Sequence, residues 1–103
     1  MASPMRIRAK AQGDVADVRV LMAHEMETGQ RKGADGKLVP AWFITTVDAQ
    51  HNGKSVMTAQ WGPAVSKNPY LQFKIKGAKV GDKITVTWQD NRGESRTDKA
   101  VIA

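Results

Sequence analysis

The stretch LQFKIKGAKVGDKITVTWQD, residues 71–90, decides the fold class. Its apolar residues occupy every second position, at Leu71, Phe73 and Ile75 and again at Ile84, Val86 and Trp88. Such alternation places the apolar side chains on one face of a pleated strand. Between the two segments lie glycines, which can take the positive φ that turns require. The stretch therefore predicts two antiparallel strands joined by a short connection.

Turn residues divide the rest of the chain into further short strands. Asn52-Gly53 suits the type I′ turn of a hairpin between strands at residues 41–51 and 54–61, because both residues tolerate the left-handed region. Residues 90–93 reverse the chain into a last strand at 95–102, so that residues 71–102 are expected to form a β-meander. Near the start, Met5, Ile7 and Ala9 alternate with basic residues and predict the first strand.

Residues 15–26 fit two patterns. Apolar residues at 15, 18, 22 and 26 have helical spacing, but the segment also alternates as a strand does. We favour a strand, because Val15, Val18 and Val20 are β-branched and Gly13-Asp14 suits a hairpin turn after the first strand.

Two loops interrupt the predicted strands. Residues 25–39 are rich in glycine and charge and are expected to be the longest exposed loop. Residues 62–69 form a second loop, in which Pro63 and Pro69 restrict the backbone. A rigid loop of this kind suits recognition of another protein, and it suits a crossover between two sheets equally well.

Seven short strands without a clear helix predict one domain over residues 1–103. The expected fold is all-β, an immunoglobulin-like antiparallel β-sandwich rather than a five-stranded barrel. No apolar run approaches the ~20 residues that a membrane helix needs, so we expect no membrane association. The start of the chain lacks the apolar segment of a secretory signal peptide, so we expect no signal of its own.

The composition restricts the chemistry. The chain has no cysteine, which excludes disulfides, a thiolate metal site and a cysteine nucleophile. His24 and His51 could form a metal site with a nearby carboxylate, but single histidines so placed commonly bond to backbone or water, and we favour that interpretation. The GADGK segment at residues 33–37 does not fit a nucleotide-binding loop, and no serine lies in a nucleophile motif. We therefore predict no enzyme activity, no cofactor and no metal.

The net charge of +6 favours acidic partners or polyanions. Basic residues cluster at Arg6, Arg8 and Lys10, at Arg31 and Lys32, and at Lys74, Lys76, Lys79 and Lys83. One interpretation is a small basic nucleic-acid-binding β-domain. Against it, the aromatic residues near these lysines have the opposite strand parity and are expected in the core, which favours a basic surface that faces either solvent or a partner.

Several segments together resemble one family. They are HEMETGQRK at residues 24–32, PAWFI at 40–44, HNGK at 51–54, WGPAVSKNPYLQF at 61–73 and KGAKVGDKITVTWQDNRGESRTD at 76–98. In order and at this chain length, they closely resemble the SoxZ family of bacterial sulfur oxidation.

The resemblance implies an immunoglobulin-like sandwich that pairs with SoxY in the SoxYZ carrier complex of thiosulfate oxidation. SoxY presents a cysteine on a C-terminal GGCGG arm, and the sulfur intermediates are attached there while other Sox enzymes act on them. This chain ends in KAVIA and is similar to the companion subunit. The resemblance further implies a periplasmic location, reached together with SoxY. Without SoxY, an uncovered apolar face would favour a homo-oligomer.

Individual contact residues can only be proposed. Methionines and aromatic residues are enriched in interface cores, and core packing is the alternative for each of them. The candidates for the SoxY interface are Met22, Met26, Trp42, Trp61, Pro63 and Tyr70. Arg31 and Lys32 are the candidates for a basic surface that holds partner enzymes or anionic sulfur adducts.

Overall fold

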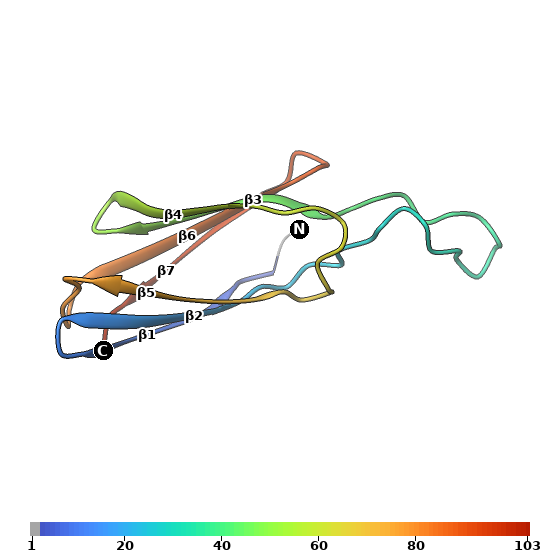
Figure 1. Ribbon diagram of the computed structural model, residues 1–103. Coiled ribbons are helices and arrows are strands. Elements are labelled where there is room, and N and C mark those ends of the chain that lie inside the picture. The colour runs from blue at the N-terminus through green and yellow to red at the C-terminus, as the bar shows by residue number, and fades with distance from the viewer. Residues whose placement is uncertain (1–2) are drawn as a thin grey trace.

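A computed structural model describes residues 3–103, so the predicted domain extends two residues beyond the described part. It contains seven strands: β1 (Arg6–Gln12), β2 (Val15–Leu21), β3 (Ile44–His51), β4 (Lys54–Gln60), β5 (Tyr70–Lys76), β6 (Lys83–Asp90) and β7 (Ser95–Val101). They form two antiparallel sheets, with strand orders β1-β2-β5 and β4-β3-β6-β7, stacked as two layers (Figure 1). The predicted all-β antiparallel sandwich is confirmed. Within residues 3–103, no helix has the length and apolarity needed to span a membrane.

The core lies between the two sheets, where the alternating apolar residues meet. The β1-β2-β5 sheet contributes Ala9, Ala16, Val18, Val20 and Ile75. The other sheet contributes Ile44, Val47, Ala49, Ile84, Val86 and Trp88. All of these side chains are buried, as the period of two along each strand predicts.

The predicted hairpin turn at Asn52-Gly53 is confirmed, but one predicted pairing of strands is wrong. Asn52 and Gly53 both have positive φ, 51° and 85°, and connect β3 to its hairpin partner β4. In contrast, β5 and β6 do not form a hairpin. Strand β5 pairs with β2, and β6 pairs with β3 and β7, so residues 77–82 cross from one layer to the other. The meander expected over residues 71–102 is thus limited to β6 and β7.

The two sides of the sandwich differ. On the β1/β7 side, Ala11 N–H donates to Ala103 O and Ala103 N–H to Ala9 O, both at 2.9 Å, so backbone bonds join the two sheets. On the β4/β5 side, the sheet edges leave a hollow of about 310 Å³, which is lined by Met57 and Phe73 among others. Both of these side chains remain half-buried. The sandwich is therefore closed on one side and open on the other.

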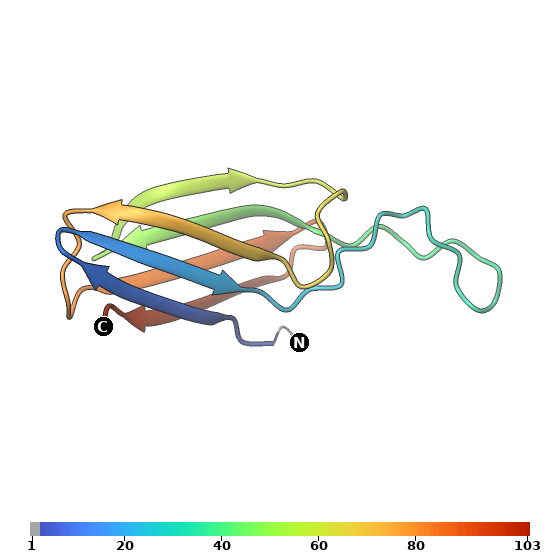
Figure 2. The same cartoon turned by 60° about the horizontal axis from the view of Figure 1, so that its bottom comes forward.

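Residues 22–43 leave the sandwich as a long arm (Figures 1 and 2). Strand β2 ends at Leu21 instead of residue 26, and β3 begins at Ile44 instead of residue 41. The expected extension of β2 to residue 26 is wrong, because pairing with both neighbouring strands ends at Leu21, opposite Arg6 of β1 and Tyr70 of β5. Met26 itself takes a left-handed backbone with φ 51°, which no regular strand accommodates. The arm contributes to the elongated shape of the molecule, with extents of 53 × 21 × 20 Å.

Candidate functional site

The arm is fixed to the sandwich by a buried carboxylate, Asp90, at the end of β6. Its Oδ2 accepts from His24 Nε2 at 3.1 Å and from Trp42 Nε1 at 2.7 Å. Its Oδ1 accepts from the backbone N–H of Arg92 and of Glu94, both at 2.9 Å. These four bonds fill the acceptor capacity of the carboxylate. Asp90 therefore acts as a clamp that joins both ends of the arm to the β6–β7 turn.

The hydrogen bonds define the protonation states of this clamp. His24 Nδ1 accepts from the backbone N–H of Met26 at 3.1 Å, so the ring proton lies on Nε2 and is donated to Asp90. Burial opposes ionisation of Asp90, but the bonds from His24, Trp42 and the two amides outweigh it and lower its pKa. The result is a neutral imidazole against an ionised, fully bonded carboxylate.

Aromatic packing completes the root of the arm. The His24 ring lies edge-on to Trp42 and to Trp88, with centroids 5.1 Å apart in both pairs. The guanidinium of Arg92 lies 4.4 Å from the centroid of the Trp42 ring, a cation–π contact. Met26 adds its Sδ as acceptor for Ile44 N–H at 3.3 Å. These contacts hold the backbone of Met26 in its unfavourable conformation.

Beyond this root the arm is a narrow two-stranded ribbon rather than an irregular loop. Glu27 and Trp42 exchange backbone bonds, and Val39 N–H donates to Arg31 O at 2.7 Å. Arg31 also reaches back to Glu27 with three side-chain bonds of 2.8–3.2 Å. Near the tip, Leu38 is 59% exposed. The arm thus offers a defined surface with an apolar residue near its end.

The loop between β4 and β5 is tied to the same root. Asn68 accepts from His24 N–H through Oδ1 at 3.1 Å and donates its own N–H to His24 O at 2.9 Å. Lys67 forms an ion pair with Glu25 at 3.3 Å. The loop connects the two sheets, as the crossover interpretation predicted. Arm and loop therefore form one continuous end of the molecule.

The family model for "Sulphur oxidation protein SoxZ" matches residues 5–101. The chain belongs to the SoxZ family. This match includes all seven strands, the arm and the crossover loop. A search of the curated proteins finds no match. Membership of the SoxZ family connects the protein with sulfur oxidation.

The segments that suggested the SoxZ family converge on the arm root. His24 comes from the first segment, Trp42 from the second, and Asp90 with Arg92 from the last. His24 is predicted from the sequence to bond to backbone or water. The structure shows a backbone bond and, in addition, a carboxylate 66 positions away. No local signal marked Asp90 as the partner, because the pairing depends on which strands meet.

The predicted contact residues lie in different environments. Met22 and Met26 are buried, so their present role is core packing. Trp42 and Trp61 are half-buried, and Trp61 packs against the core. Pro63, Arg31 and Lys32 are exposed at the arm end of the molecule. Tyr70 is 57% exposed but lies on the outer face of the β1-β2-β5 sheet.

The two histidines do not share a site. His24 lies at the arm root beside the start of β3, whereas His51 ends β3 and bonds through Nε2 to Asp82 Oδ2 at 2.7 Å. This bond, with those from Lys79 N–H and Asn52, lowers the pKa of Asp82 to about 2. Over residues 3–103, no three His, Cys, Asp or Glu side chains are grouped closely enough to hold a metal ion.

Proposed function

We propose that this chain is a non-catalytic subunit of a carrier complex in thiosulfate oxidation, and that it binds and stabilises SoxY. The observation that carries the proposal is the SoxZ family match over residues 5–101. The chain has no cysteine, so a sulfur intermediate bound through a thiolate has to be carried by another subunit. SoxY, with the cysteine of its C-terminal arm, supplies that group in the complex we propose.

The chemistry of the polar clusters supports a binding role. Asp90 has no acceptor position left for a substrate proton, and His24 uses both ring nitrogens within the protein. A general base needs a free lone pair directed at its substrate. The arm root thus serves to hold the arm in one direction, and this rigidity lowers the entropy lost when a partner binds.

We place the SoxY contact at the arm end of the molecule. The arm contributes Arg31, Lys32 and Leu38, and the crossover loop contributes Pro63 beside the half-buried Trp61. Aromatic residues and arginine are enriched in protein interfaces, which have an apolar centre and a polar rim. We also propose that the pair works in the periplasm and is exported together with SoxY, and that other Sox enzymes contact the assembled complex transiently.

Co-expression with SoxY of the same organism tests this function. Tagged SoxY should retain the untagged chain at a 1:1 ratio, measured by size-exclusion chromatography with light scattering. Replacement of the arm cations by R31E and K32E should weaken the complex, whereas K54E and K99E on the four-stranded sheet should not. Failure of the folded wild-type chain to bind folded SoxY at micromolar concentration would refute the proposal.

A further inference from the structure

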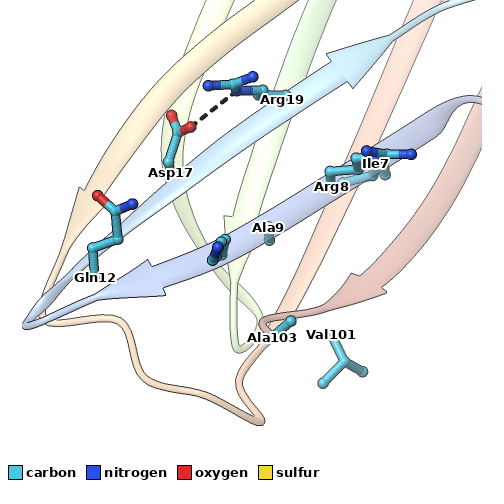
Figure 3. Close-up of a pocket in the computed structure, with 9 residues that line it drawn as sticks. Ile7, Arg8, Ala9, Gln12, Asp17, Arg19, Val101 and Ala103 are labelled. Carbon is cyan, nitrogen blue, oxygen red and sulfur yellow. Dashed lines mark hydrogen bonds and ion pairs between the residues drawn. The ribbon is translucent and has the colours of Figure 1, made fainter.

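The register of the β1-β2-β5 sheet gathers basic residues on its outer face, the side opposite the core. Cross-strand neighbours on this face are Arg8 with Arg19, Lys10 with Asp17, and Asp17 with Lys74. The cations of the face are Arg6, Arg8, Lys10, Arg19, Lys74 and Lys76, and its single carboxylate is Asp17. We call this set the cationic face. Arg8 on β1 and Arg19 on β2 help to line a hollow of about 560 Å³. Figure 3 shows how these two side chains lie.

Most of this charge is not neutralised within the protein. Asp17 bonds to Gln72 and to Arg19, and these bonds lower its pKa. Across residues 3–103, the other five cations of the face form no salt bridge. The outer face of the second sheet differs, because serine, threonine and glutamine predominate there, and its charged residues include Asp48 as well as the two lysines Lys83 and Lys99. The positive charge is thus concentrated on one sheet.

One end of the cationic face is apolar. Leu21 and Tyr70 are direct cross-strand neighbours, 42% and 57% exposed, with Arg6 on the far side of Leu21. Beside them lies a hollow of about 340 Å³ lined by Pro4, Arg6 and Met22, among others. An exposed leucine–tyrosine pair next to a hollow can receive an apolar side chain of a partner.

We propose that the cationic face is a transient docking surface for a protein that presents carboxylates around an exposed apolar side chain. The inference rests on the proposed function, and the partners of this chemistry are the enzymes that act on sulfur held by the carrier complex. Permanent subunit interfaces are largely apolar, whereas this face is charged with one small apolar end, which suits rapid, salt-dependent encounters.

Two other occupants fit less well. Nucleic acids bind to β-sheets through rows of aromatic side chains on which bases stack, and Tyr70 is the one aromatic residue that the strand register places on this face. A second copy of the chain would bring like charges together, which disfavours the contact. A protein surface with carboxylates around an exposed apolar side chain can contact both the cations and the Leu21–Tyr70 pair.

The test uses the complex of this chain with SoxY and the purified Sox enzymes of the same organism. Thiosulfate oxidation is measured against the concentration of the complex at several salt concentrations. The variant R6E/R8E/K76E changes three exposed cations that have no carboxylate as cross-strand neighbour. We expect its half-saturating concentration to rise at least about tenfold at low salt, with an unchanged maximal rate and a reduced salt dependence. The variant L21S should raise the same concentration without altering the salt dependence.

The matched control is K54E/K83E/K99E, which makes the same charge change on exposed lysines of the other sheet. An equal rise in the control would overturn the proposal, because net charge alone would then explain the effect. Loss of SoxY binding in R6E/R8E/K76E would also overturn it, since the face would then be the permanent interface. Binding of a fluorescent 20-mer oligonucleotide that depends on the three cations, with normal half-saturation, would indicate a nucleic-acid surface instead. If the wild-type chain fails to bind SoxY, the proposed function itself fails.

Discussion

Replacement of Asp90 by asparagine tests whether the arm root is a clamp. The change preserves the shape of the side chain but replaces one acceptor oxygen with an NH₂ group. In either orientation of the amide, two donors then face another donor, either His24 Nε2–H and Trp42 Nε1–H or the amides of Arg92 and Glu94. His24 cannot escape by moving its proton to Nδ1, because Nδ1 accepts from Met26.

Each buried donor left without an acceptor costs about 1–3 kcal/mol, so D90N, which leaves two such donors, should lower the free energy of unfolding by about 2–6 kcal/mol. Urea denaturation at pH 7, followed by circular dichroism, measures this loss. The control is D48N, in which the two donors to the carboxylate are the hydroxyls of Ser55 and Thr58. These hydroxyls can rotate, so we expect a change below about 0.5 kcal/mol. Equal effects of D90N and D48N would refute the reasoning.

The remaining predictions concern the arm and the opposite end of the sandwich. Gly29 has φ +85°, and a Cβ added there would lie 3.1 Å from Ala41 Cβ, so G29A should destabilise the arm by about 1–2 kcal/mol and speed hydrogen exchange of the Glu27 and Trp42 amides about tenfold. The control is G62A, because a Cβ at Gly62 would have no neighbour within 4 Å, and we expect it to leave these exchange rates unchanged. Equal exchange rates in the two variants would contradict the role of the arm ribbon. The pKa of Asp82 is lowered to about 2, so the ionised carboxylate stabilises the folded protein. This contribution to the free energy of unfolding should be complete above about pH 4 and should be lost as the pH falls from about 4 to about 2. Acid titration of the wild type against D82N measures this, and parallel stability curves would show that the carboxylate contributes nothing.

Local patterns in the sequence account for the strands but not for their arrangement. Alternation at residues 71–75 and 84–88 and the turn at Asn52-Gly53 depend on neighbouring residues, and these predictions are confirmed. The hairpin expected between β5 and β6 is wrong because a six-residue link can either turn back within a sheet or cross between layers. Only the packing of the whole chain decides between the two.

The candidate site was predictable to a smaller extent. Leu21 has the same strand parity as Asp17 and Arg19, and this pattern could have marked it as exposed. The Asp90 clamp binds Trp42, which lies 48 positions before it, and His24, which lies 66 positions before it. The cationic face requires β5 to lie beside β2. Neither relation has a signal within one segment, because both depend on the order of strands in the sheets.

Lysines at the open side of the sandwich protect its sheet edges, and some of these lysines also belong to the cationic face. Strands β4 and β5 are both sheet edges, and the backbone groups along such edges can pair with strands of other molecules. Lys74 and Lys76 lie on the β5 edge and Lys54 begins β4, so their charges oppose edge-to-edge aggregation. A variant that replaced these lysines with neutral residues would therefore lose colloidal stability as well as partner affinity. Selection for solubility and selection for docking would then act on Lys74 and Lys76 in the same direction.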